Sequence, residues 1–307
     1  MPITPTDVIW MDGKLVPWDS ATVHITTHAL HYGSSVFEGI RAYDRNGTAS
    51  IFRLDDHIRR LYDSCKIYRM DIPFTPDEIK RACIETVKRN DLKSAYIRPL
   101  VHRGTGTISV DPREADVRVS IFTIYLGAYL GPEALEQGVD VCVSSWNRLG
   151  HNVFPAMAKI GGQYINSQLI KMEAVTNGFA EGIAIDGNGF VAEGSGENLF
   201  LVRDGVITTP PLASSILRGI TRQSAITIAR DLGYTVKEEF IPREMLYVAD
   251  ELFFTGTAAE VSPIRSVDRI AIGAGSRGPV TKAIQDAFFD LVSGDGEDPH
   301  GWLTPIA

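Results

Sequence analysis

Residues 182–203, with the sequence GIAIDGNGFVAEGSGENLFLVR, decide the fold of the second half of the chain. They contain three short apolar runs that glycine-rich segments separate: 182–186, 189–193 and 198–203. Runs of this length between turn residues predict β-strands. The residues between and after them, 186–189 and 203–205, predict tight turns, because glycine, asparagine and aspartate readily adopt positive φ angles.

On either side of this stretch the pattern continues. Another short apolar run at 139–144 predicts a further strand. Two helices are expected among the strands, at about 162–177 and 219–232, and each is followed by a glycine, Gly178 and Gly233. Glycine is the preferred residue just after a helix C-terminus. The second half should therefore be rich in strands and carry several helices.

The first half mixes helices with strands. Apolar residues after Asp55 recur at the spacing of one helix face: Ile58, Leu61, Tyr62 and Cys65. A second helix is expected from Thr75-Pro76 to Asn90-Asp91, because Thr75 and Glu78 form a capping-box pattern with proline at the first helical position. Its core face is Ile79, Ala82, Cys83 and Val87.

Strand patterns follow at 95–101 and 117–125. Residues 126–137, LGAYLGPEALEQ, contain two glycines and a proline and are typical of a connector. A chain of 307 residues is long enough for two domains. We therefore expect an α+β fold with a small domain over 1–125, a connector over 126–137 and a larger β-rich domain over 138–307.

The composition is that of a globular protein with an acidic surplus. Lys and Arg number 30 and Asp and Glu 38, which gives a formal net charge of −8. A nucleic-acid-binding protein would usually carry a basic patch and a high pI, so this class is not expected. A membrane-spanning protein is not expected either, because the longest uncharged apolar stretch, about 119–132, is shorter than the roughly 20 residues of a spanning helix.

The cysteines and the N-terminus indicate a cytoplasmic protein. The three cysteines, Cys65, Cys83 and Cys142, show no metal spacing, and an odd number is a poor disulfide framework. Buried thiols in a reducing compartment are expected. The N-terminal segment MPITPTDVIWMDGK lacks the basic and apolar regions of a signal peptide.

The motifs argue against a metal site, a nucleotide-binding site and a serine-nucleophile site of the usual kinds. His24, His28 and His31 cluster, but no carboxylate or cysteine accompanies them at ligand spacing, so no metal site is expected. The sequence has neither a Walker A motif nor a GxSxG nucleophile motif. The triplet 194–196 lacks the rest of a dinucleotide-binding fingerprint.

Lys159 is the candidate catalytic residue. It lies in the segment PAMAKIGGQY, where alanine, methionine and isoleucine surround it. An ordinary lysine is a solvated charge, but this apolar setting and the pair Gly161-Gly162 indicate a side chain in a cavity that backbone approaches closely. Burial disfavours the charged form of a lysine, and Schiff-base chemistry requires the neutral amine.

Glu193 is a candidate binding residue for a cationic group. It ends an apolar strand, and the glycines of EGSGENLF (193–200) let backbone pass close to a ligand. A turn with solvated carboxylates is the simpler alternative. The functional alternative is a buried carboxylate that holds a cationic heteroaromatic nitrogen, since either charge alone would be costly to bury.

Two further segments suggest an anion-binding site. In SSILRGITRQS, Gly219 precedes an amphipathic helix, so the amides of Ile220 and Thr221 lie at the positive end of that helix. In FFTGTAAE, a strand ends at 255–257 and offers more amides and hydroxyls. Together with the lysine and the carboxylate, these segments describe a cofactor with a phosphate and an aldehyde.

In this order along the chain, the motifs resemble those of the fold-type IV pyridoxal-phosphate enzymes, specifically the bacterial branched-chain amino acid aminotransferases. The resemblance extends from about residue 10 to Trp302. It rests on HALHYGSSVFEGIR (28–41), SAYIRPL (94–100), GAYLGPEALEQG (127–138), VSSWNR (143–148), KIGGQY (159–164), EGSGENLF (193–200), SSILRGITR (214–222) and TGTAAE (255–260). It implies a small N-terminal α/β domain and a larger, barrel-like C-terminal domain.

The resemblance also implies roles for residues that would bind pyridoxal 5'-phosphate. Lys159 would form a Schiff base with the cofactor and then move the proton, and Glu193 would keep the pyridine nitrogen protonated. Tyr164 would donate a hydrogen bond to the phenolic oxygen. The phosphate would be bound by Arg60, Ile220, Thr221 and Thr257. The shape of the site would come from Gly196, Leu217, Gly219 and Gly256.

For the substrate, the resemblance implies an apolar aromatic wall with polar groups at its edge. The matching residues are Tyr32, Phe37, Tyr96 and Tyr129. Arg98 would bind the distal carboxylate of glutamate or 2-oxoglutarate, and backbone at Thr257 and Ala258 the α-carboxylate. Tyr32 and Val110 would come from the neighbouring subunit, so a homodimer is the smallest assembly expected, and a hexamer is compatible with it.

The implied activity is a ping-pong transamination of L-leucine, L-isoleucine and L-valine with 2-oxoglutarate. The alternatives on the same fold are a D-amino acid aminotransferase, an R-selective amine aminotransferase, aminodeoxychorismate lyase and a non-catalytic cofactor-binding protein. Leu126 stands where bacterial members often carry tryptophan, and Ser109 where a glycine is frequent. The order of preference among the donors is therefore left open.

Overall fold

The computed structural model describes residues 3–127, 131 and 133–306. The chain forms two compact units, and each is described by itself. The first unit contains the described residues of Met1–Leu126, Ala158–Gln163 and Val292–Ala307. The second contains those of Gly127–Met157 and Tyr164–Leu291. Tyr129, expected in the substrate site, lies outside the described residues.

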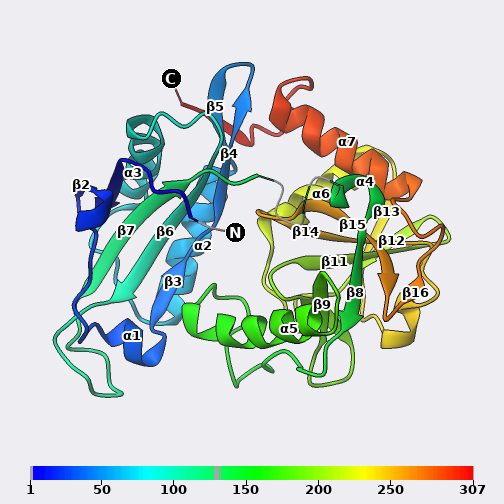
Figure 1. Cartoon of the computed structure of the whole chain (residues 1–307), viewed down its shortest axis with the longest axis horizontal. Helices are drawn as coiled ribbons and strands as arrows, with labels where there is room; N and C mark the ends of the chain where they lie inside the picture. Colours follow the sequence, from blue (N-terminus) through cyan, green and yellow to red (C-terminus); the bar gives the residue numbers. More distant parts are fainter. Residues whose placement is uncertain (1–2, 128–130, 132, 307) are drawn as a thin grey trace. The chain divides into compact units, whose positions relative to one another are not determined.

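The first unit is built on an antiparallel sheet, which within the described residues has eight strands in the order β17-β5-β4-β6-β7-β1-β2, with β3 paired to β6. The helices α2 and α3 pack side by side against this sheet (Figure 1). The strands are β1 (Val8–Met11), β2 (Lys14–Pro17), β3 (Ser35–Phe37), β4 (Ile40–Arg45), β5 (Thr48–Phe52), β6 (Ala95–Arg103), β7 (Val117–Ile124) and β17 (Leu303–Pro305). The helices are α1 (His28–Tyr32), α2 (Leu54–Ile67), α3 (Pro76–Arg89) and the 3-10 turns Trp18–Ser20 and Gly161–Gln163.

Both helices predicted in the first half are confirmed. The capping box of α3 is present, because the Glu78 amide donates to Thr75 Oγ1 (3.3 Å) and the Thr75 amide to Glu78 Oε2 (2.7 Å). The predicted apolar faces are buried, including the two thiols of Cys65 and Cys83, except that Tyr62 is only half-buried. Cys142 in the second unit is buried and free as well.

The second unit contains a closed barrel. Six strands follow one another in the order β10-β9-β8-β15-β14-β11, and β10 pairs with β11 to close the ring. The strands β12 and β13 extend the sheet beyond β11, and β16 pairs with β15. The strands are β8 (Val139–Val143), β9 (Glu181–Ile185), β10 (Val191–Gly194), β11 (Asn198–Arg203), β12 (Val206–Thr209), β13 (Thr235–Glu238), β14 (Glu251–Gly256), β15 (Glu260–Val267) and β16 (Ile270–Ala271). The barrel-like architecture expected for the second half is confirmed.

Apolar side chains from opposite strands fill one core of this unit, among them Val141, Ile183, Leu199, Phe254 and Ile264. Burial of large aliphatic and aromatic side chains stabilises such a core by about 2 kcal/mol each. The helices of this unit are α4 (Ala134–Gln137), α5 (Tyr164–Thr176), α6 (Ile220–Asp231), α7 (Pro279–Ser293) and the 3-10 turn Arg243–Leu246.

The strands and helices predicted in the second half are confirmed, with one shift at a helix start. The helix expected from about residue 162 begins as the 3-10 turn Gly161–Gln163 and becomes α-helical at Tyr164. Gly178 and Gly233 follow their helices with positive φ angles of 77° and 84°, as expected for glycine after a C-terminus.

The compact units follow the sequence less simply than the expected domains over 1–125, 126–137 and 138–307. The segments Ala158–Gln163 and Val292–Ala307 group with the first unit although both lie in the second half of the chain. The extent of the folding domains stays a prediction. Among the described residues, no helix combines the length and the apolar character needed to cross a membrane.

Candidate active site

Lys159 is fixed to the first unit through its backbone. The Phe37 amide donates to the Lys159 carbonyl (3.1 Å), and the Lys159 amide donates to Ser64 Oγ on α2 (3.1 Å). Val36 and Ile160 form an antiparallel bridge next to this bond. The lysine segment therefore extends the edge of the sheet beside β3.

The pair Gly161-Gly162 lies close to another backbone segment, whereas the cavity expected around the lysine stays a prediction. The Gly162 amide donates to the Gly33 carbonyl at 3.0 Å. A Cβ atom on Gly161 would lie 2.3 Å from Ser35 Oγ, closer than real Cβ contacts. A side chain at this position would force the Ser35 hydroxyl to move.

Four residues expected in the site are brought together in the first unit. Lys159 Nζ lies 4.9 Å from the centre of the Phe37 ring, and the Arg98 guanidinium lies 4.5 Å from the same ring. Arg98 Nη2 donates to the Tyr96 hydroxyl at 2.7 Å. Tyr96 and Arg98 are two residues apart on β6, so both point to the same face of the sheet. The two aromatic rings thus lie beside two cations, and their role as the wall of a substrate site stays a prediction.

Arg60 is oriented by a buried carboxylate that the sequence did not reveal as a site residue. Glu38, with no exposed surface, accepts from Arg60 Nε (2.6 Å), Arg60 Nη2 (2.8 Å) and His57 Nδ1 (2.7 Å). Burial alone would raise the pKa of Glu38, but the charges and hydrogen bonds of Arg60 and His57 outweigh burial and hold this pKa well below its usual range. Burial lowers the pKa of His57, so this ring favours its neutral form.

Tyr32 and Val110 are at the surface of the first unit, 48% and 81% exposed. The Tyr32 hydroxyl donates to the Ile108 carbonyl at 2.7 Å, so α1 and the loop that carries Val110 are joined. Both side chains are therefore accessible at the surface of this unit, and their use by a neighbouring subunit stays a prediction.

The second unit places Glu193 at the end of β10, where it is 4% exposed. Its Oε2 accepts from Asn198 Nδ2 and from the Leu217 amide, both at 3.1 Å. Its Oε1 forms an ion pair with Arg148 Nη2 at 3.0 Å. Glu193 is thus the buried carboxylate that the functional alternative requires, not a solvated residue of a turn.

The expected anion-binding residues surround the start of α6. Gly219 is the N-cap of this helix, and a Cβ atom there would lie 1.9 Å from Asn198 Oδ1. Since Asn198 Nδ2 also donates to the Leu217 carbonyl (2.9 Å), one asparagine joins Glu193 to the segment before α6. Ile220 and Thr221 form the first turn of α6, at the positive end of the helix.

The second side of the region expected to bind an anion is the end of β14. Asn198 pairs with Thr255 across β11 and β14, and the chain turns at Thr257 and Ala258 directly after the strand. The backbone of Gly256 lies beside the carbonyl of Gly196. Thr255 Oγ1 is buried and has no hydrogen-bond partner among the described residues, which leaves it available to a ligand.

The structure thus brings Lys159, Phe37, Tyr96 and Arg98 together in the first unit, and Glu193 together with the start of α6 in the second. Tyr32 and Val110 are at the surface of the first unit. Tyr164 begins α5 in the second unit. Three partners were missed by the sequence: Glu38, Asn198 and Arg148. All lie within motifs that carried the resemblance, but a polar residue in a motif does not reveal which side chain it contacts.

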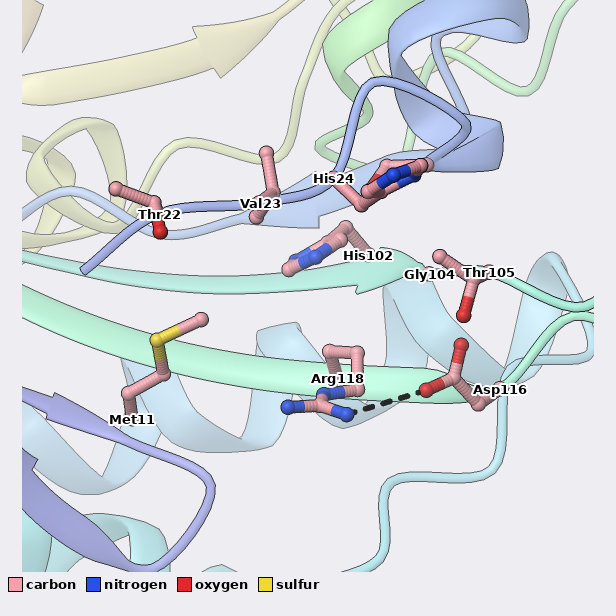
Figure 2. A pocket seen from close by; sticks show the side chains of 10 residues that line it. Met11, Thr22, Val23, His24, His102, Gly104, Thr105, Asp116 and Arg118 are labelled. Carbon is pink, nitrogen blue, oxygen red and sulfur yellow. Dashed lines mark hydrogen bonds and ion pairs between the residues drawn. The ribbon is translucent and has the colours of Figure 1, made fainter. Parts of the chain in front are cut away.

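A pocket of about 160 Å³ in the first unit is separate from these groups (Figure 2). His24, His102 and Arg118 are among the side chains around it, and Arg118 pairs with Asp116 at 3.3 Å. None of the residues expected in catalysis or binding lines it. Among the described residues, no group of three or more histidine, cysteine, aspartate or glutamate side chains is arranged to hold a metal ion.

Comparison with known proteins gives the family. The sequence pattern of the family described as amino-transferase class IV matches residues 35–267. A branched-chain-amino-acid aminotransferase from Salmonella typhimurium is 52% identical over 303 residues, 98% of this chain and 97% of the relative.

Two solved structures are similar over the whole chain. The crystal structure of the Escherichia coli branched-chain amino acid aminotransferase has a TM-score of 0.97 at 51% identity, over 98% of this chain and 100% of that chain. The T.th. branched-chain amino acid aminotransferase with pyridoxamine 5'-phosphate has a TM-score of 0.96 at 47% identity, over 100% of both chains.

Proposed function

We propose that this chain, which belongs to the class IV aminotransferase family, uses pyridoxal 5'-phosphate to move the amino group of L-leucine, L-isoleucine or L-valine to 2-oxoglutarate. The products are the branched 2-oxo acids and L-glutamate. The observation that carries the proposal is the group around Lys159, whose amine lies beside Phe37 together with Arg98 and Tyr96. An apolar wall suits an aliphatic side chain, and the arginine at its edge suits the second carboxylate of glutamate.

The residues of the second unit fit the cofactor. Pyridoxal 5'-phosphate has a basic ring nitrogen and a phosphate, and the unit offers a buried carboxylate at Glu193 and a helix N-terminus at Ile220 and Thr221. The buried and unpartnered Thr255 Oγ1 is a further donor or acceptor in the same region. Gly219 has no Cβ to collide with Asn198, which donates to Glu193.

When bound, the cofactor supplies an aldehyde carbon for the amino group and an electron-withdrawing ring. Lys159 Nζ holds the cofactor and moves the proton at the α-carbon of the substrate. Glu193 binds the ring nitrogen in its protonated form, and Tyr164 donates a hydrogen bond to the phenolic oxygen. The phosphate is bound by Arg60, Ile220, Thr221 and Thr257, and Gly196, Leu217, Gly219 and Gly256 shape its surroundings.

The two substrates of a ping-pong cycle use the same wall in turn. Phe37 and Tyr96 contact the aliphatic side chain and exclude water from it, while Arg98 binds the distal carboxylate of 2-oxoglutarate. The backbone at Thr257 and Ala258 binds the α-carboxylate that both substrates share. Tyr129 belongs to this proposal through the sequence alone.

A homodimer is part of the proposal, and a hexamer is compatible with it. An apolar patch on α1 and the neighbouring loop is exposed, which is unusual for a monomer. Its residues and exposed fractions are Ile25 (73%), Leu30 (58%), Tyr32 (48%), Ile108 (68%) and Val110 (81%). A second copy would cover this patch and receive Tyr32 and Val110. The cytoplasmic location expected from the cysteines also stays a prediction.

The absorbance spectrum of the purified protein tests the proposal. L-leucine alone should remove the visible band of the bound cofactor, and 2-oxoglutarate should restore it. D-alanine and an R-arylamine serve as parallel donors, and Lys159→Ala, which should show neither change, is the control variant. A response to D-alanine or the amine alone would favour one of the sister activities. A protein that binds pyridoxal 5'-phosphate but responds to no donor would favour the non-catalytic alternative.

A further inference from the structure

We propose that Arg148 is a positioning residue for the cofactor: it orients the Glu193 carboxylate and joins it to the first turn of α5. This inference rests on the proposed function, because it takes Glu193 as the residue that binds the ring nitrogen. Arg148 follows the strand β8 in the motif VSSWNR, to which the sequence assigned no role. Its own amide donates to the Ile185 carbonyl at 2.8 Å, which fixes the residue to the end of β9.

One nitrogen of the Arg148 guanidinium contacts the end of β10, the strand that carries Glu193. Arg148 Nη2 lies 3.0 Å from Glu193 Oε1 and donates to the carbonyls of Gly194 (2.9 Å) and Ser195 (3.0 Å). These are the last residues of β10 and the start of the glycine turn. Arg148 therefore fixes both the carboxylate and the backbone from which it projects.

The other terminal nitrogen forms hydrogen bonds with residues of α5. Arg148 Nη1 donates to Ser167 Oγ at 2.9 Å and to Asn166 Oδ1 at 3.3 Å. Both residues belong to the first turn of the helix that Tyr164 begins. A single planar group thus connects the strand that carries Glu193 to the helix that carries Tyr164, the two residues proposed to bind the ring nitrogen and the phenolic oxygen of the cofactor.

Burial makes this connection energetically important. The side chains of Arg148 and Glu193 are only 4% and 5% exposed. A carboxylate removed from water favours its neutral form unless charged or polar donors surround it, and a guanidinium at 3.0 Å favours the ionised form. Arg148, Asn198 and the Leu217 amide together supply those donors. The carboxylate is then held in a fixed orientation before the cofactor binds.

The alternative is that Arg148 only stabilises the fold. Removal of either partner of a buried ion pair is destabilising in any case, so a loss of stability does not separate the two roles. Affinity for the cofactor does separate them, provided that the effect of Arg148 depends on Glu193. Pyridoxamine 5'-phosphate is the appropriate probe, because it cannot form a covalent bond with Lys159 and its dissociation constant reports contacts alone.

The experiment is a double-mutant cycle on the full-length protein freed of cofactor and titrated with pyridoxamine 5'-phosphate. Arg148→Met should weaken binding by about 10- to 100-fold, the range seen when the supporting partner of a ligand-binding side chain is lost at metal sites. Arg148→Lys keeps the charge but loses the planar guanidinium with its several donors, so its dissociation constant should lie between those of Arg148→Met and the wild type. In the Glu193→Gln background, Arg148→Met should change the dissociation constant by less than about threefold, since interacting residues are not additive.

Arg265→Met is the control for loss of an ion pair elsewhere on the barrel, at a more exposed position. Arg265 pairs with Asp140 on the same barrel, Nε to Oδ1 at 2.9 Å, and this pair includes none of the residues proposed to bind the cofactor. Its replacement should leave the dissociation constant within about threefold of the wild type.

The outcomes separate this inference from the proposed function. A wild-type protein that binds neither pyridoxamine 5'-phosphate nor pyridoxal 5'-phosphate would refute the proposed function itself. Normal binding by the wild type, Arg148→Met and Arg148→Lys alike would overturn only the role of Arg148. An equal loss of affinity with and without Glu193 would also overturn it, because Arg148 would then act on something else. If Arg148→Met fails to fold, the same cycle is run with Arg148→Lys.

Discussion

The buried carboxylate Glu38 gives the sharpest test of how the first unit is held together. Its side chain has no exposed surface, and its partners Arg60 and His57 are 12% and 2% exposed. Glu38→Gln keeps the shape of the side chain but removes its charge. Arg60 then loses a two-point ion pair and keeps one neutral acceptor.

The expected loss of unfolding free energy at pH 7 is about 3 kcal/mol, the lower end of the range for breaking a buried ion pair. The lower end applies because glutamine retains one oxygen that can accept from Arg60. Removal of one partner leaves the other charge buried, which is the main cost. Asp56→Asn is the control: Asp56 pairs with Arg53 at 2.7 Å but is 43% exposed, so its loss should cost less than about 1 kcal/mol.

The difference between the wild type and Glu38→Gln should depend on pH in a defined direction. Although burial would raise the pKa of Glu38, its partners lower it below the value of the unfolded chain. A carboxyl with a depressed pKa contributes stability that is fully present above the unfolded value of 4.5 and is lost as the pH falls through the folded value. The two proteins should therefore differ most at neutral pH and converge below about pH 4.5.

Urea unfolding followed by tryptophan fluorescence is a suitable assay. Three of the four tryptophans, Trp10, Trp18 and Trp302, belong to the first unit, so the signal reports mainly on that unit. A Glu38→Gln variant as stable as the wild type at pH 7 would refute the argument from buried charge. A difference that stays constant down to about pH 3 would refute the assignment of the ionised carboxylate.

Three further predictions concern other parts of the chain. Burial, with Glu181 nearby, raises the pKa of Glu197 to about 8, so the unfolded chain loses this proton at a lower pH than the folded chain and the wild type should lose stability as the pH rises from about 4.5 to 8. Glu197→Gln should remove this difference in stability between pH 5 and pH 8, measured by thermal unfolding, and an equal difference in both proteins would contradict it. Arg98→Met should raise KM for 2-oxoglutarate by about 10- to 100-fold, which corresponds to the loss of a hydrogen bond between charged groups, and should change the rate of the half-reaction with L-leucine by less than about threefold. Equal losses with both substrates would argue against a role at the distal carboxylate. Thr75→Ala should lower the unfolding free energy by about 1 kcal/mol through loss of the α3 cap, and Thr75→Ser, which keeps the hydroxyl, is the control. No change in urea unfolding would mean that this cap contributes nothing to the stability of the protein.

Local patterns predicted most of the secondary structure because their causes are local. The helix α3 could be foreseen from Thr75 and Glu78, since a capping box involves side chains and amides only three residues apart. The hairpin between β11 and β12 could be foreseen from Asp204-Gly205, both of which have positive φ angles. Neither feature needs information from the rest of the chain.

The pairings between distant segments could not be foreseen in the same way. Ile160 pairs with Val36 across more than one hundred residues, and this places the lysine segment in the first unit. The closure of the barrel by β10 and β11 likewise depends on register and twist over six strands. An apolar run tells that a strand is buried, but not which strand lies beside it.

The sequence by itself determined the fold class, the succession of strands and helices, and the chemical types of the site residues, because periodicity, turn residues and ordered motifs are properties of short segments. Only the tertiary structure decided the partners of those residues: Glu38 for Arg60, Arg148 and Asn198 for Glu193, and the aromatic wall for Lys159. The physical reason is that the charge state and orientation of a buried side chain depend on what surrounds it in space, and those neighbours come from segments far apart in the chain.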